Sequence, residues 1–132
     1  MAKIFVLDDD EMQNILNKLL FKTIGITDVD YRTTGKEALE YLEVCKNNSM
    51  FPDLMFVDLN LTGMGGIEFV RQYELQYRKY SSHLSIIILS NSAYEEHQEA
   101  VLKYESVIKF WSKPLNKNKL TEILQLSNKT TR

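Results

Sequence analysis

The sequence predicts a single α/β domain with a parallel β-sheet covered by helices on both faces. Apolar runs of four or five residues alternate with longer segments in which apolar residues recur every three or four positions. This alternation is typical of repeated strand–helix units, and strands buried on both faces read as continuous apolar runs. A chain of 132 residues, 44% of them hydrophobic and 26% charged, suits one compact core.

Five strands are expected, and each is a short apolar run. They lie at residues 4–7, 28–32, 54–58, 86–89 and 107–110. Five helices should connect or follow them. They are expected from residue 11 to near Gly25, from Gly35 to the Asn47-Asn48-Ser49 segment, after the glycines at 63, 65 and 66, at 94–104 and at 116–126. The three glycines should let the backbone turn tightly there.

Apolar residues at helical spacing predict which face of each helix packs on the sheet. In the first helix one stripe is formed by Met12, Ile15, Leu16, Leu19 and Leu20. In the second and third helices the inward residues should be Ala38, Leu39, Leu42, Cys45, Ile67, Val70 and either Tyr73 or Leu75. The last two helices should dock through Ala100, Val101, Tyr104, Leu120, Ile123 and Leu124. The fourth helix is the most polar, so it should pack loosely.

Composition excludes several classes of function. The formal net charge is −2, and no basic stripe typical of nucleic-acid binding is evident. No apolar run approaches the length of a membrane span, and Met1-Ala2-Lys3 leads directly into a strand without a cleavage site, so a cytoplasmic location is expected. The lone Cys45 lacks zinc-site spacing and is expected in the core. Residues 1–127 should form the domain, with 128–132 as a short polar tail.

The residues with chemical potential lie where the predicted strands end. Asp58 ends the third strand, Asp8-Asp9-Asp10 follow the first, and Ser90 follows the fourth, while Lys113 lies shortly after the fifth. The carboxyl ends of parallel strands share one edge of the sheet, so these side chains should converge. Any one acid taken alone is more simply a turn former or a helix N-cap. The ordered set instead favours a cation site with a reacting carboxylate.

The motifs Val6-Leu7-Asp8-Asp9-Asp10, Val57-Asp58, Leu89-Ser90 and Phe110-Trp111-Ser112-Lys113-Pro114 together resemble the receiver domains of two-component response regulators. The resemblance covers nearly the whole chain, and stand-alone receivers of the chemotaxis type are the most similar in size. It implies a flavodoxin-like, doubly wound sheet with strand order 2-1-3-4-5.

The resemblance also implies roles for individual residues. Asp58 would be the phosphoacceptor, Lys113 would pair with the phosphoryl oxygens, and the Lys113–Pro114 bond would be cis. Ser90 would donate a hydrogen bond to the phosphoryl group. Mg²⁺ would be held by Asp8, Asp9, Asp58 and the backbone carbonyl of Asn60.

A conformational switch is implied as well. Ser90 would move toward the phosphoryl group and Phe110 would rotate inward, changing an output face that includes Tyr94, Tyr104 and Trp111. Trp111 is either exposed on that face or packed under the last helix. The chain departs from the family pattern at four positions: Phe110 replaces a common Tyr, Asn91 a small residue, Thr62 a Pro and Gly65 an acid.

The predicted function is acceptance of a phosphoryl group from a histidine kinase or a phosphotransfer protein, with self-phosphorylation and autodephosphorylation activity rather than metabolic catalysis. Output would pass to a downstream protein, by direct binding or by onward relay of the phosphoryl group. Two alternatives remain: a haloacid-dehalogenase-type phosphohydrolase with Asp8 as nucleophile, and a receiver-like binding module that is never phosphorylated.

Overall fold

The structure, a computed structural model, describes residues 2–91 and 95–130, and it contains one five-stranded parallel sheet in the order β2-β1-β3-β4-β5. The strands are β1 (Ile4–Leu7), β2 (Val29–Arg32), β3 (Leu54–Asp58), β4 (Ser85–Ser90) and β5 (Val107–Ser112). The helices are α1 (Glu11–Lys22), α2 (Gly35–Asn47), α3 (Gly66–Gln76), α4 (Glu95–Leu102) and α5 (Lys117–Thr130), with a short 3-10 turn at Arg78–Tyr80. The predicted fold class and strand order are therefore confirmed.

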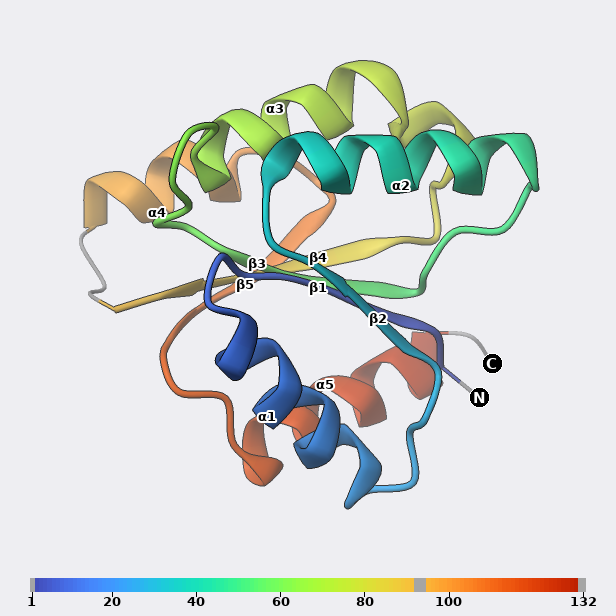
Figure 1. Ribbon diagram of the computed structural model, residues 1–132, viewed down its shortest axis with the longest axis vertical. Coiled ribbons are helices and arrows are strands. Elements are labelled where there is room, and N and C mark those ends of the chain that lie inside the picture. The colour runs from blue at the N-terminus through green and yellow to red at the C-terminus, as the bar shows by residue number, and fades with distance from the viewer. Residues whose placement is uncertain (1, 92–94, 131–132) are drawn as a thin grey trace.

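The sheet lies between two layers of helices. Helices α1 and α5 cover one face, and α2, α3 and α4 cover the other (Figure 1). Every residue of β1 and β3 is buried, as expected for central strands of a parallel sheet. Successive side chains alternate between the faces, so Phe5 packs in a larger core cluster with residues of α2 and α3, while Ile4 packs in a smaller one with residues of α1 and α5.

The inward faces of the other helices agree largely with the periodicity. Ala38, Leu42 and Cys45 of α2 are buried, as are Val101 of α4 and Leu120 and Ile123 of α5. In α3 the buried residues are Phe69, Val70 and Tyr73, whereas Leu75 is 64% exposed, so Tyr73 is the inward one of the two alternatives. Two elements are longer than expected, because β5 continues to Ser112 and α5 to Thr130.

The predicted inward stripe of α1 is wrong. Met12, Ile15, Leu16 and Leu19 are 42–62% exposed, and Leu20 is only partly buried. The residues that α1 buries are Asn14, Asn17 and Phe21.

Two hydrogen bonds explain this rotation of α1. Asp10 caps the helix by accepting from the backbone N–H of Gln13, and the Asn14 side chain donates to the carbonyl of Asp8 at 2.8 Å. Together they fix the phase of the helix directly after β1, because a cap determines how the first turn enters. Periodicity revealed an apolar stripe, and these polar contacts turn it toward solvent.

Among residues 2–91 and 95–130, no helix combines the length and apolar character that crossing a bilayer requires. The helices instead present polar side chains outward and bury apolar ones against the sheet, except on α1.

Gly66→Ala should destabilise the protein by about 1 to 3 kcal/mol, as overpacking does. A Cβ at Gly66 would lie 2.6 Å from the carbonyl oxygen of Asp58 and 2.7 Å from the Cα of Leu59, and neither backbone atom can rotate away. Gly65→Ala is the matched control, because a Cβ there has no heavy atom within 4 Å. Its free energy of unfolding in urea should stay within about 0.5 kcal/mol of wild type, since lower unfolded-state entropy offsets weaker capping. Equal losses in the two variants would contradict the argument.

Candidate functional site

Three aspartates converge at the carboxyl edge of the sheet. Strands β1 and β3 pair in parallel with Leu7 opposite Val57, so the next residues, Asp8 and Asp58, lie side by side. One carboxylate oxygen from each of Asp8, Asp9 and Asp58 lies within 4.8 Å of the others. Asp8 and Asp58 are buried, and Asp9 is exposed. The predicted convergence is therefore present.

Backbone amides hold one oxygen of each carboxylate. Asp58 Oδ1 accepts from the N–H of Asn60 at 2.9 Å, and Asp8 Oδ1 accepts from the N–H of Asp10 at the same distance. Both are short-range turns in which Asp bonds the backbone two residues on. Asp9 Oδ2 accepts from the N–H of Thr62 at 3.2 Å, which ties the loop after β3 to the end of β1.

Lys113 lies between the two buried carboxylates. Its Nζ is 3.1 Å from Asp8 Oδ2 and 3.1 Å from Asp58 Oδ2. Its backbone N–H donates to the carbonyl of Ser90 at 2.7 Å, and the Lys113–Pro114 peptide bond is cis as the resemblance implied. Burial lowers the pKa of Lys113, but hydrogen bonds and charge from Asp8 and Asp58 outweigh it, so the net pKa is raised. The lysine therefore stays charged at neutral pH, and its stabilisation is lost only as pH rises through that raised pKa.

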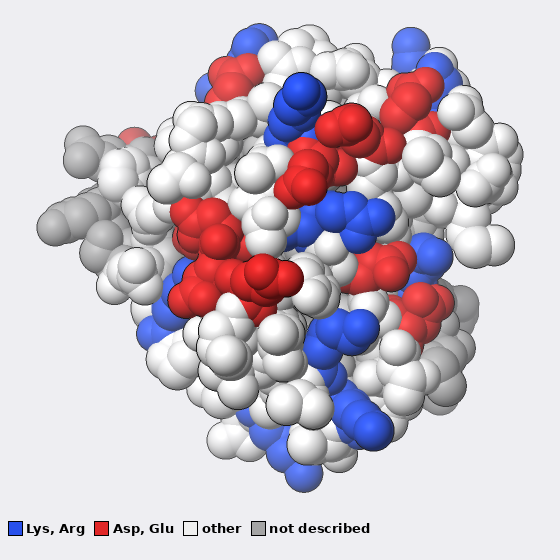
Figure 2. Space-filling model, viewed as in Figure 1, with Lys and Arg blue, Asp and Glu red and all other residues white. Residues whose placement is uncertain are grey.

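These side chains line an open cavity of about 470 Å³. Its walls are Asp8, Asp9, Asp10, Gln13, Asp58, Asn60, Asn91, Lys113 and Pro114. Figure 2 shows acidic side chains gathered at the left of the molecule, on the side where β1 runs into α1. Asn91, noted in the sequence as a departure from the family pattern, lines this cavity, whereas Ser90 is fully buried behind it.

Sequence reasoning missed Gln13 as a lining residue. Its position one helical turn after the aspartates was the available signal, because a side chain there returns toward the helix N-terminus. The expected apolar stripe hid this signal, since it assigned the inward face of α1 to other residues.

The residues predicted for the switch and output face are dispersed along β5 and α4. Phe110 and Tyr104 are partly buried against the larger core cluster. Trp111 is partly buried against the smaller core cluster, with the ammonium group of Lys119 5.9 Å from its ring centroid. Packing beside α5 is thus the observed alternative for Trp111. Tyr94 lies outside the described residues.

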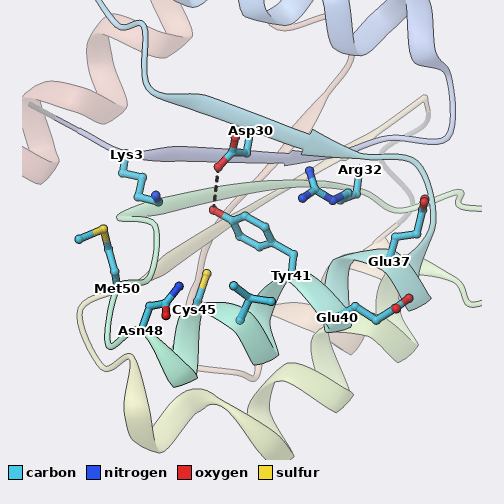
Figure 3. A pocket seen from close by; sticks show the side chains of 10 residues that line it. Lys3, Asp30, Arg32, Glu37, Glu40, Tyr41, Cys45, Asn48 and Met50 are labelled. Carbon is cyan, nitrogen blue, oxygen red and sulfur yellow. Dashed lines mark hydrogen bonds between the residues drawn. The ribbon is translucent and has the colours of Figure 1, made fainter.

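A second hollow of about 500 Å³ lies between β2 and α2 (Figure 3). Its lining mixes basic Lys3 and Arg32 with acidic residues, and the Tyr41 hydroxyl donates to Asp30 at 3.2 Å. Burial raises the pKa of Tyr41, and its ring stacks on Phe5 at 4.3 Å. These groups are engaged with one another, so the acidic pocket is the stronger candidate for chemistry.

The fold and the site define a doubly wound α/β protein with an acidic, lysine-containing pocket at the carboxyl edge of its sheet. The chain belongs to the response regulator receiver domain family, whose profile matches residues 4–125. It is 32% identical over 94 residues to a protein-glutamate methylesterase/protein-glutamine glutaminase of Treponema denticola, covering 70% of this chain and 23% of that protein. It is 26% identical over 122 residues to hybrid signal transduction histidine kinase I of Dictyostelium discoideum, covering 92% of this chain and 7% of the kinase.

Solved structures show the same fold. A two-component response regulator from Cytophaga hutchinsonii superimposes with a TM-score of 0.89 at 21% identity, covering 96% of both chains. A receiver domain protein from Methanospirillum hungatei superimposes with a TM-score of 0.79 at 21% identity, covering 98% of this chain and 95% of the other. The chain thus spans a small part of its curated relatives and nearly all of these solved domains.

Lys113→Met should lower the stability of the metal-free protein by about 2 kcal/mol. Removing one partner of a buried ion pair costs about 3 to 5 kcal/mol, and the 20% exposure of the Lys113 side chain reduces this value. Lys117→Met, at an exposed site, is the control. Urea unfolding at neutral pH measures both, and the deficit of Lys113→Met should shrink when Mg²⁺ is added. A Lys113→Met variant as stable as the control would show that the pairs contribute nothing.

Proposed function

We propose that this chain is a phosphorylation switch in which Asp58 accepts a phosphoryl group from a phosphohistidine of a histidine kinase or a phosphotransfer protein. The observation that carries the proposal is a buried Asp58 whose Oδ2 shares one lysine with Asp8 inside an open cavity. Such a carboxylate is reachable and is held in a fixed orientation. Membership of the receiver family supports the same chemistry and the same class of donor.

The acidic residues fit Mg²⁺. Mg²⁺ prefers oxygen ligands and is held by one or two carboxylates together with phosphate oxygens. Asp8, Asp9 and Asp58 each offer an oxygen at mutually close positions, and Asn60 adds its backbone carbonyl at the cavity wall. When bound, the metal would neutralise charge as one anion approaches another.

The protein side chains have distinct roles in this transfer. Asp58 is oriented by the Asn60 N–H on Oδ1, so Oδ2 attacks phosphorus. The P–N bond of the donor breaks, its electron pair returns to the imidazole, and a P–O bond forms on Asp58. Lys113 then moves its hydrogen bond from the Asp58 carboxylate to a phosphoryl oxygen. Hydrolysis by water later returns the carboxylate and inorganic phosphate.

The switch would pass from Ser90 to the output face. Ser90 ends β4, and its carbonyl accepts from the Lys113 N–H, so a hydroxyl that turns toward the phosphoryl group pulls on both loops. Phe110 and Tyr104, both partly buried beside this region, can then repack. Tyr104, Trp111 and Tyr94 are the proposed output residues, and a downstream protein would bind there or take the phosphoryl group onward.

The exposed stripe of α1 is the proposed contact with the phosphoryl donor. The stripe starts at Met12, between Asp10 and Gln13, which both line the cavity. A protein that brings a phosphohistidine to Asp58 must therefore cover the start of α1. Figure 2 shows uncharged side chains over much of this helix, as expected where an apolar partner surface docks.

Intact-mass measurement with acetyl phosphate tests the acceptor. Wild type with Mg²⁺ should gain one phosphoryl group, and Asp58→Asn should gain none, because an amide oxygen is a poor nucleophile. Omitting Mg²⁺ should abolish the adduct on wild type. Asp8→Asn separates the alternatives: an adduct that survives Asp58→Asn but vanishes in Asp8→Asn would establish the dehalogenase-type chemistry. No adduct on any protein would favour a binding module.

Leu16→Glu tests the donor contact. It should slow transfer from a phosphohistidine protein by at least about 10-fold, because a charge replaces an apolar anchor, and leave the rate with acetyl phosphate unchanged. Leu75→Glu on α3, where the leucine is 64% exposed on the other face of the sheet, is the matched control. Equal transfer rates for Leu16→Glu and Leu75→Glu would remove α1 from the interface.

A further inference from the structure

A small cavity lies behind the acidic pocket, between the inward face of α1 and the loop after β5. Its volume is about 30 Å³, and its walls are Asp8, Gln13, Asn17, Leu89, Lys113, Pro114 and Leu115. A cavity needs roughly 10 to 15 Å³ of this kind of volume to hold one water molecule. The space is therefore large enough for a water and too small for an organic ligand.

The polar walls offer the hydrogen bonds that a buried water requires. An ammonium group has three donors, and Lys113 uses two of them on Asp8 and Asp58. The Gln13 amide donates to Asn17 Oδ1 at 3.1 Å, which leaves the Gln13 carbonyl as an acceptor and the Asn17 amide as a donor. Two donors and one or more acceptors match the two to four partners typical of buried water.

The inward face of α1 is unusual for a helix packed on a sheet. Asn14 and Asn17 are almost fully buried, and Gln13 lies beside them. Buried amides cost free energy unless their hydrogen bonds are satisfied. Asn14 is partly satisfied by the Asp8 carbonyl, and Gln13 and Asn17 satisfy each other in part. The remaining amide groups of Gln13 and Asn17 border the same cavity as Asp8 and Lys113.

We propose that this cavity is a water site, and that one water held by Gln13 and Asn17 positions Lys113 and Asp8 for the reaction at Asp58. The water takes the third donor of Lys113 and a lone pair of Asp8, so it restrains both groups from the side opposite the cavity mouth. This inference rests on the proposed function, because positioning matters through the phosphorylation rate. Gln13 and Asn17 are positioning residues, since they act through the water on groups that contact the phosphoryl group.

Asn17→Leu tests the water site because leucine is similar in size to asparagine and offers no hydrogen bond. With acetyl phosphate and Mg²⁺, its maximal phosphorylation rate should fall by at least about 10-fold, the size typical of lost outer-shell contacts at metal sites. Asn17→Ser should restore the rate to within about twofold, because a hydroxyl keeps a polar partner and leaves room for water. Gln76→Leu is the control, since Gln76 also donates to a side-chain amide four residues away on a helix, Gln72, but lies on exposed α3.

A high-resolution crystal structure of wild type and Asn17→Leu, without donor, tests the water independently of phosphorylation. Wild type should show one ordered water within hydrogen-bond distance of Lys113 and Asn17, and Asn17→Leu should show none. A dry wild-type cavity would overturn the proposal. So would an Asn17→Leu variant that is phosphorylated at the wild-type rate, or an Asn17→Ser variant as slow as Asn17→Leu. If wild type holds the water but Asp58 gains no phosphoryl group, the proposed function fails and the positioning role fails with it, while the water site stands.

Discussion

Two carboxylates buried side by side at the edge of a sheet are the constraint on which this structure depends. Asp8 and Asp58 are adjacent because β1 and β3 pair in parallel at the centre of the sheet. Their charges in a buried place are tolerable when a cation lies between them. Lys113 supplies it from β5, two strands beyond β3 in the sheet, and the bond from its N–H to the Ser90 carbonyl sets where its loop turns. The loops after three of the five strands are thus tied together through one ammonium group.

The same acids also set the orientation of α1. Asp10 caps the helix, and the Asp8 carbonyl accepts from Asn14, so the helix is anchored to the site through polar bonds before any apolar packing is counted. Phe21, near the other end, is fully buried and completes the docking. The cost of turning Asn14 and Asn17 inward is offset by these hydrogen bonds, and the gain is a polar wall behind the acidic pocket. The apolar side chains that would otherwise have packed on the sheet are left for a partner.

The sequence predicted the strands, the convergence of the aspartates and the approach of Lys113, because parallel pairing places all strand ends on one edge whatever the helices do. The inward faces of α2 and α3 followed from periodicity, since no polar anchor competes with their apolar stripes. The facing of α1 did not follow, because a helical period identifies a stripe without saying which way it points. Single hydrogen bonds such as Asn14 to Asp8 and Thr62 to Asp9 decide such details. They depend on distances of a few ångströms that residue order does not encode.

The charge of the pocket explains why a divalent cation and a phosphoryl group belong together at this site. Three carboxylates and one lysine leave the pocket with a formal charge of −2, so an incoming phosphoryl donor, itself anionic, is repelled. A divalent cation brings the pocket to neutrality, and only then can Asp58 attack without opposing charge. Once the phosphoryl group is attached, its oxygens outcompete the Asp58 carboxylate for Lys113, because charge-assisted bonds favour the group with more negative oxygen. The lysine that stabilises the unphosphorylated pocket is therefore the same group whose displacement can signal phosphorylation, through the backbone bond that joins its loop to Ser90.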